Sequence, residues 1–177
     1  SGSTHLLSVI LTEKTGKNTM EFACEHLFEK LEIPVLNWSK RGDGNYDGSG
    51  LGLEMRPKDL LKIGQLILNN GKYNEEQIVS KRWVEKLTNP FVKSPTEWGL
   101  QNSTHGYCWY YAEFNNEKIS YGMGYGGQFI LLIPERELII VSCFNHDTPD
   151  GIPQQIGFLN NNLPEILEKT TEIIRGN

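Results

Sequence analysis

The sequence predicts an α+β fold in which a helical portion precedes an antiparallel sheet and a last helix. Apolar residues recur with helical spacing in the first half of the chain. After residue 106, short runs rich in β-branched and aromatic residues alternate with turn sequences instead. We therefore expect one domain over 1–177, with mainly helical and loop segments over 1–105 and the sheet with its C-terminal helix over 106–177.

Two helices are predicted at the start of the chain. In the first, Ser3 is a candidate N-cap and Gly16 a candidate stop. In the second, Thr19 is the candidate N-cap, and Pro34 ends the helix because the residue before a proline disfavours the helical conformation. The first of these helices is apolar and starts abruptly, which suggests that something upstream of it has been removed.

A third and a fourth helix are predicted after a loop rich in Gly, Asp and Asn. Pro57 suits the first helical position, Asp59 favours the positive end of the helix dipole, and Asn70-Gly71 ends the helix. The third helix is almost wholly apolar, so we expect it to be well buried. Ser80 is the candidate cap of the fourth helix, which ends near Pro90.

Four segments after residue 106 predict strands: GYCWYYAEF, EKISYGMG, QFILLIPE and ELIIVSCF. The turns between them are Asn115-Asn116, a glycine cluster and Pro134-Glu135-Arg136, and links this short favour an antiparallel meander. FILLI and LIIV are uninterrupted apolar runs, which are typical of strands covered on both faces. A last helix is predicted with Asn162 as its cap and Pro164 in its first turn.

Composition and spacing exclude several classes of function. The net charge is −5 and no dense cluster of Lys and Arg occurs, so neither a nucleic-acid groove nor an anionic-membrane face is expected. No apolar run reaches the ~18 residues that a membrane span needs. Cys24, Cys108 and Cys143 are far apart and set among apolar residues, so we expect buried structural thiols. No Cys or His cluster has metal-ligand spacing, and we expect neither a metal nor a cofactor.

The segment YGMGYGGQF, residues 121–129, contains the G-x-G-x-x-G spacing of a dinucleotide-binding turn at Gly122, Gly124 and Gly127. That function needs a helix directly after the glycines, to hold the pyrophosphate at its N-terminus. The segment that follows is predicted to be a strand, so nucleotide binding is not favoured. Two interpretations stay open: a glycine-rich hairpin, or a bare strand along which a ligand lies.

Four segments carry a family resemblance: SGSTHLLSVILTEKTGK, FACEHLFEKLEIPVLNW, GSGLGLEMRPKDLLKIGQLILNNGKYNEEQIVSKRWVEKL and YGMGYGGQFILLIPERELIIVS. Together they resemble the serine hydrolases of the β-lactamase superfamily, most closely the class C-like esterases and the 6-aminohexanoate-dimer hydrolases. The resemblance implies a β-lactamase/transpeptidase-like fold, an antiparallel sheet flanked by helices. It also implies that this chain is the C-terminal portion of the domain, with N-terminal elements missing.

In that family a serine of a Ser-x-x-Lys motif attacks a carbonyl, and the lysine and a tyrosine of a second motif transfer the protons. A serine hydroxyl needs such a neighbouring base because it is a weak nucleophile. Neither Ser-x-x-Lys nor Tyr-x-Asn occurs in the 177 residues. The resemblance places both motifs upstream of Ser1, since Ser1-Gly2 is similar to the pair that closely follows the catalytic tyrosine. We therefore expect the chain to be inactive alone, although the parent protein is expected to be an enzyme.

The family's third motif, Lys-Thr-Gly or a variant, lies on a sheet strand beside the active-site cleft. A literal Lys14-Thr15-Gly16 occurs, but it is interpreted as a helix C-terminus, where lysine favours the dipole and glycine caps. The matching strand segment is Gly122-Met123-Gly124 instead. The resemblance then lacks the cation that binds a β-lactam carboxylate. This departure disfavours a β-lactamase or transpeptidase and favours an esterase, amidase or peptidase.

By resemblance, the backbone N–H of Tyr125 is one donor of the oxyanion hole. Substrate-binding candidates are Gly122, Met123, Gly124, Gln128 and Trp38. Three of these have a structural alternative: Met123 as a core residue, Gln128 as a residue that shapes the turn, and Trp38 as an ordinary packed aromatic.

The expected partner of the intact protein is a small-molecule ester or amide, or a peptide. A non-catalytic peptidoglycan- or peptide-binding relative of the same fold stays an alternative. Since part of the cover for the apolar strands is expected from missing elements, we expect either an exposed apolar face or a dimer that hides it. The compartment stays open, because a periplasmic or secreted protein would carry its signal upstream.

Overall fold

The computed structural model of the protein describes residues 2–34, 37–89, 91–94, 100, 102–145, 147 and 149–175. These residues form two compact units, Ser1–Val79 and Ser80–Asn177, and each unit is described by itself. The sheet of the second unit includes two short strands ahead of residue 106 that were not predicted.

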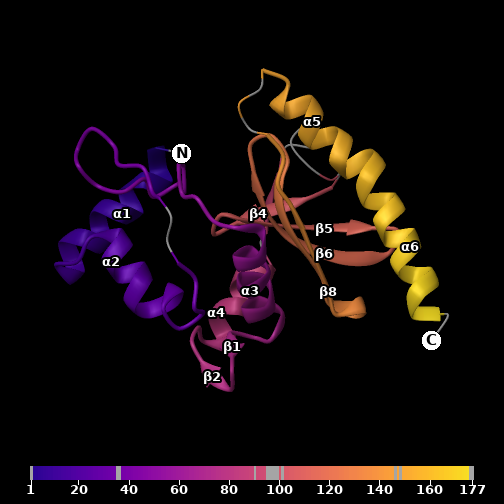
Figure 1. The fold of residues 1–177 in the computed structure, drawn as a ribbon, viewed down its shortest axis with the longest axis horizontal. Coiled ribbons are helices and arrows are strands. Elements are labelled where there is room, and N and C mark those ends of the chain that lie inside the picture. The colour runs from indigo at the N-terminus through magenta and orange to yellow at the C-terminus, as the bar shows by residue number, and fades with distance from the viewer. Residues whose placement is uncertain are drawn as a thin grey trace. The chain divides into compact units, whose positions relative to one another are not determined.

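The first unit is mainly helical (Figure 1). Its elements are α1 (Gly2–Thr15), α2 (Thr19–Ala23), a π-helical turn η1 (Cys24–Phe28) that continues α2, α3 (Pro57–Leu68), and a hairpin of β1 (Lys72–Tyr73) and β2 (Glu76–Gln77). The long loop between η1 and α3 contains only isolated bridges among its described residues. The buried core of this unit consists of Phe28, Leu31, Ile33 and Leu66.

The α1 helix exposes its apolar face. The helix begins at Gly2, so the predicted cap Ser3 lies within it, and it ends as predicted before Gly16, whose φ is +70°. Three large apolar side chains of this helix are more than half exposed: Leu6, Leu7 and Ile10. The dimer expected from the sequence stays a prediction.

The predicted Thr19 cap of the second helix is wrong. The side chain of Asn18 accepts a hydrogen bond from the backbone N–H of Glu21 at 3.0 Å, and the Glu21 carboxylate accepts one from the Asn18 N–H at 3.0 Å. This reciprocal pair is a capping box. The Thr19 hydroxyl shares a hydrogen bond with the buried Ser8 hydroxyl of α1 instead, at 2.5 Å. Because Thr19 bonds to Ser8 of another helix, the cap is Asn18, one residue earlier than predicted.

The α3 helix begins and ends where the sequence predicts. Pro57 occupies its first turn, and Gly71 follows its end with a φ of +84°. The fully buried Asp59 receives two hydrogen bonds from Arg56, from Nε at 2.6 Å and from Nη2 at 3.0 Å. These bonds hold the pKa of the Asp59 carboxyl below its ordinary value. The expectation that this helix is well buried holds only in part, because the Leu61 side chain is 42% exposed.

Replacing Asp59 with asparagine is expected to destabilise the protein more at neutral pH than in acid. A carboxyl whose pKa is lowered by folding contributes stability above its unfolded pKa of ~3.9, and that contribution is lost as pH falls through the folded pKa. Urea unfolding of Asp59→Asn and the unmodified protein at about pH 7 and about pH 3 should show a smaller difference in acid. Glu165→Gln, at an exposed ion pair, is the control. An equal loss at both pH values would contradict this prediction.

The second unit contains α4 (Lys81–Thr88) and one six-stranded antiparallel sheet. The strands follow each other in sequence order: β3 (Val92–Lys93), β4 (Thr104–Gly106), β5 (Trp109–Phe114), β6 (Glu117–Gly124), β7 (Gln128–Ile133) and β8 (Leu138–Ser142). A 3-10 turn, η3 (Pro134–Arg136), links β7 to β8. The four predicted strands, their turns and the meander are confirmed, except that the first predicted strand starts at Trp109 rather than Gly106, because Tyr107 and Cys108 form a turn after β4. Ser80 caps α4 as predicted, while Pro90 lies outside the described residues.

A continuous helical run closes the second unit. It consists of α5 (Gly151–Gly157), a π-helical turn η4 (Phe158–Asn162) and α6 (Leu163–Arg175). The predicted cap at Asn162 is therefore wrong, since the run begins earlier. Pro164 has no backbone N–H, so it cannot donate a hydrogen bond within the helix. Just before it, the Leu163 N–H donates to Phe158 O in a wider π-helical turn, and the helical run continues through the proline.

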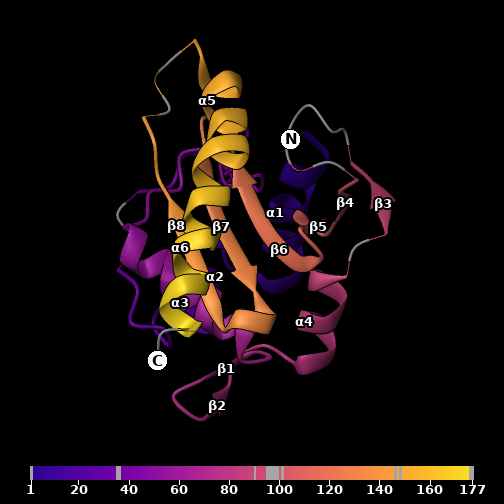
Figure 2. The ribbon, with the colours of Figure 1, turned by 90° about the vertical axis from the view of Figure 1, so that its right-hand side faces the viewer.

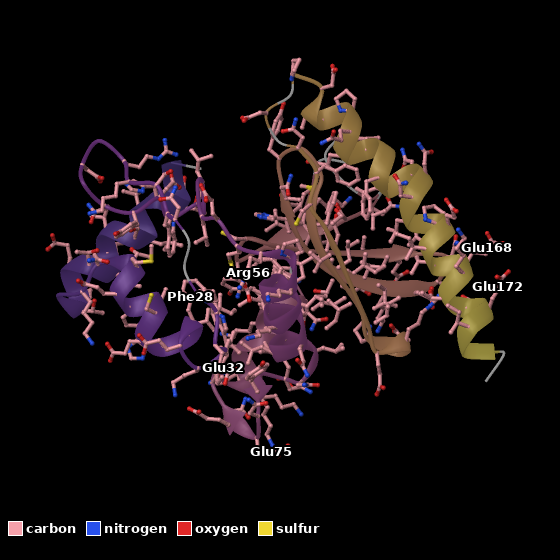
Figure 3. The ribbon with its side chains drawn as sticks, viewed as in Figure 1. Phe28, Glu32, Arg56, Glu75, Glu168 and Glu172 are labelled. Atoms are coloured by element: carbon pink, nitrogen blue, oxygen red, sulfur yellow. The ribbon has the colours of Figure 1, made fainter. Side chains whose placement is uncertain are left out.

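The α6 helix packs along one face of the sheet (Figures 1 and 2). Phe129, Leu131 and Ile133 of β7 face the helix, whereas Ile130 and Leu132 point to the opposite face. All five side chains are at most 7% exposed, which confirms that β7 is covered on both faces. The outer side of α6 carries Glu168 and Glu172, which project away from the sheet (Figure 3).

Two of the three cysteines are not the buried thiols that the sequence indicated. Cys108 and Cys143 are exposed, and Cys24 is partly exposed. Cys108 lies in the β4–β5 turn with a φ of +61°, directly after Tyr107 at +53°. A turn of this kind projects its side chains outward, which the apolar neighbours in the sequence do not reveal.

Candidate functional site

The strand β6 extends beyond one of its two neighbours. Its pairing with β5 ends at Tyr110 opposite Tyr121, whereas its pairing with β7 continues to Gly124 opposite Gln128. Within the described part of the sheet, residues 122–124 therefore have a strand partner on one side only. β7 follows the glycines, so the helix that a dinucleotide turn requires is absent there.

The β6–β7 turn consists of Tyr125, Gly126 and Gly127. The φ angles of the two glycines are +81° and +93°, in the left-handed region that favours glycine. The Tyr125 side chain is 50% exposed. Five of the six candidate residues lie together on this strand, turn and strand: Gly122, Met123, Gly124, Tyr125 and Gln128.

Gly122 makes room for Trp109. A Cβ atom at this position would lie 2.9 Å from Trp109 Cζ3 and 3.0 Å from Ile130 Cγ2. The indole is fixed in place, because its Nε1 donates to the buried Ser120 hydroxyl at 2.5 Å. The space beside this glycine is thus filled by a side chain of the sheet itself.

Met123 points to the other side of β6, toward the helices. Its sulfur accepts a hydrogen bond from Nε2 of the buried Gln155 at 3.0 Å, and the side chain packs against the core beneath α6. Gln128 donates from Nε2 to the backbone oxygen of Phe144 at 2.6 Å, which links the start of β7 to the segment just after β8. The substrate contacts expected for both residues stay predictions.

Trp38, the sixth candidate, belongs to the first unit. Its Nε1 donates to the backbone oxygen of Asp47 at 3.0 Å, and its ring lies 5.9 Å from that of Tyr46. Asp47 itself is 1% exposed and is paired with Arg41. The indole thus organises the loop between η1 and α3, and its role toward a substrate stays a prediction.

Sequence reasoning missed the residues that hold the turn: Ser142, Phe144, Gly151, Gln154 and Gln155. Each contacts the segment 123–128 from more than ten positions away. No motif marks them, apart from the adjacent glutamines in GIPQQIG.

The role of the Tyr125 N–H as an oxyanion donor stays a prediction. Burial raises the pKa of Tyr121, the buried neighbour of Gly122. Partial desolvation raises the pKa of the Cys143 thiol in the same direction, although that side chain is exposed. Among the residues that the structure describes, no group of three or more His, Cys, Asp and Glu side chains could hold a metal ion. In the same part of the chain, no helix is long and apolar enough to cross a membrane.

The antiparallel sheet flanked by helices is the fold of the β-lactamase-like hydrolases, and the family resemblance predicted from the sequence is confirmed. The chain is similar to the 6-aminohexanoate-dimer hydrolase of Paenarthrobacter ureafaciens, with 25% identity over 158 residues. A solved structure from Bacillus anthracis, provisionally assigned as a 6-aminohexanoate-dimer hydrolase, matches 95% of this chain with a TM-score of 0.73 and 25% identity.

An uncharacterized protein of Alkalihalophilus pseudofirmus is also 25% identical, over 175 residues. The two sequence matches cover 82% and 85% of this chain. The chain spans 51% of the Alkalihalophilus protein, 39% of the Paenarthrobacter enzyme and 43% of the Bacillus structure. No protein-family model matches the sequence.

Proposed function

We propose that this chain is the C-terminal part of a serine hydrolase that cleaves an ester or amide through an acyl-enzyme. The observation that carries the proposal is the Tyr125-Gly126-Gly127 turn, which follows a sheet strand in a fold similar to 6-aminohexanoate-dimer hydrolases. In this proposal the nucleophile and its base come from polypeptide outside residues 1–177. The absence of Ser-x-x-Lys from the chain and the greater length of its relatives support this.

The role of the chain in this reaction is electrostatic. The serine oxygen attacks the substrate carbonyl carbon, and the carbonyl oxygen becomes an oxyanion. The backbone N–H of Tyr125 donates to that oxyanion, together with the N–H of the nucleophilic serine. Each such donor contributes ~3 kcal/mol of transition-state stabilisation. Expulsion of the protonated alcohol or amine forms the acyl-enzyme, which water then hydrolyses.

We further propose that the substrate is recognised without a cation at residues 122–124, the end of β6 beside the turn. Gly122-Met123-Gly124 provides no positive charge, and the indole of Trp109 fills the space beside Gly122. The Paenarthrobacter relative is named as a hydrolase of the 6-aminohexanoate dimer. For this chain we infer an ester, amide or peptide that presents an uncharged group to residues 122–124.

A fluorophosphonate probe tests the proposal, because it reacts covalently with activated serines. We expect no labelling of residues 1–177 alone. We expect labelling of the polypeptide encoded by the complete reading frame, on a serine outside these residues, and loss of labelling when that serine is replaced by alanine. Mass spectrometry of the labelled peptide locates the serine.

Two results would contradict the proposal. One is covalent labelling of any serine within residues 1–177. The other is a complete reading frame that has no Ser-x-x-Lys and takes up no probe, which would favour the non-catalytic peptide-binding alternative instead.

A further inference from the structure

Side chains from outside the β6–β7 turn hold both of its glycine carbonyls. Gln154 of α5 donates from Nε2 to Gly126 O at 2.5 Å and also to Asn145 O at 2.9 Å. The Ser142 hydroxyl, at the end of β8, donates to Gly127 O at 2.7 Å in a buried position. Two consecutive peptide groups are thereby oriented by residues that lie 28 and 15 positions away.

The same helix also packs against the turn. A Cβ atom on Gly151, the first residue of α5, would lie 2.3 Å from Cζ of the Tyr125 ring. Only a glycine lets the ring lie this close to the helix backbone. The ring of Phe144 approaches the turn from another direction, since a Cβ on Gly127 would lie 3.0 Å from its Cδ2. The turn therefore has α5 against Tyr125 and Phe144, just after β8, against Gly127, although the Tyr125 side chain stays half exposed.

This support matters because two adjacent glycines are the most permissive backbone that a chain can have. Without it, the peptide group between Gly126 and Gly127 could rotate at little cost. Its rotation would reverse the N–H of Gly127 and loosen the turn that begins with Tyr125. An oxyanion donor contributes only when it is already aimed before the reaction. The hydrogen bond from Gln154 to Gly126 O opposes that rotation.

We infer that Gln154 is a positioning residue for the Tyr125 N–H donor, an inference that rests on the proposed function. It does not touch the substrate; it acts by fixing the orientation of the turn. Ser142 performs the same task at the next carbonyl.

The test replaces Gln154 with methionine, which keeps the length of the side chain and removes both N–H donors. The matched control is Gln77→Met, because Gln77 also donates from Nε2 to two backbone oxygens, those of Asn70 and Val79, in the other compact unit. Both variants are made in residues 1–177 and in the polypeptide encoded by the complete reading frame. Thermal unfolding of both is recorded, so that a general loss of stability is seen directly.

In residues 1–177, amide hydrogen exchange followed by NMR should become faster at Tyr125, Gly126 and Gly127 in Gln154→Met and stay unchanged there in Gln77→Met. In the complete polypeptide, Gln154→Met should lower kcat and the rate of fluorophosphonate labelling by ~10–100-fold, with KM changed less than ~3-fold, because a lost transition-state interaction acts on kcat. Gln154→Glu should be slow at neutral pH and partly recover in acid, where the protonated carboxyl can donate again.

Unchanged amide exchange in Gln154→Met would overturn the structural part of the inference. Faster exchange with an unchanged kcat would overturn the positioning role. If the unsubstituted complete polypeptide forms no acyl-enzyme, the proposed function fails and the positioning role with it. Faster exchange in the 177-residue chain would then still establish that Gln154 orders the turn, so the two failures are distinguishable.

Discussion

Replacing Arg136 with alanine is expected to destabilise the second unit by about 2–4 kcal/mol, because a partly buried ion pair would lose its cation. Arg136 donates to both carboxylate oxygens of Glu117, at 2.6 Å each. It also donates to Leu167 O at 2.5 Å and to the Thr170 hydroxyl at 3.0 Å. One guanidinium therefore connects β6, the turn before β8, and α6.

The magnitude follows from burial. The side chains of Arg136 and Glu117 are 15% and 23% exposed, so the carboxylate that remains cannot regain full hydration. Urea unfolding followed by far-UV circular dichroism measures the change in the free energy of unfolding. Lys169→Ala is the control, because the Lys169–Glu165 pair on the outer side of α6 is more than 60% exposed and should matter little. If Arg136→Ala lowers the free energy of unfolding by less than ~1 kcal/mol, the hydrogen bonds of Arg136 do not stabilise the second unit as expected.

Replacing Gly122 with lysine, which restores the cation of the family's third motif, is expected to destabilise the protein by about 2–3 kcal/mol and to add no carboxylate binding. The new Cβ would lie 2.9 Å from Trp109 and 3.0 Å from Ile130, and neither side chain can move freely. Trp109 is held by its bond to Ser120, and Ile130 is 7% exposed. The departure from Lys-Thr-Gly is therefore built into the packing of this sheet.

Urea unfolding of Gly122→Lys measures the loss, and a double-mutant cycle with Trp109→Ala tests its cause. If the indole is the obstacle, the two substitutions together should cost less than the sum of each alone. Gly157→Ala is the matched glycine control, since nothing lies within 4 Å of a Cβ there and its φ is −58°. That helical position should gain ~0.5–1 kcal/mol. A fully stable Gly122→Lys variant would refute the assignment of this space to Trp109.

The strands and their turns could be predicted from the sequence because their signals are local. Asn115 and Asn116 adopt φ angles of +50° and +65°, as asparagine does readily, and the uninterrupted apolar run of β7 marked its burial on both faces. The short strands β3 and β4 were missed, because two or three residues are too few to show an alternation.

Helix ends were predicted less well, because a cap depends on what else its side chain can reach. Thr19 does not cap its helix, because its hydroxyl forms a hydrogen bond with Ser8 of another helix. The last helical run begins at Gly151 rather than after Asn162, because it packs on the sheet before Pro164 is reached. Propensity is a weak prior in such cases, and tertiary contacts override it.

By itself, the sequence determined that residues 106–175 form a meander followed by a helix, that Gly122-Met123-Gly124 carries no cation, and that no Ser-x-x-Lys nucleophile lies in the chain. These properties are local, since they depend on residue identity and on neighbours a few positions away. Only the tertiary structure decided that Trp109 fills the space beside Gly122 and that Gln154 and Ser142 hold the glycine turn. Such contacts join residues 13 to 28 positions apart, and they exist only after the sheet and α5 have packed together.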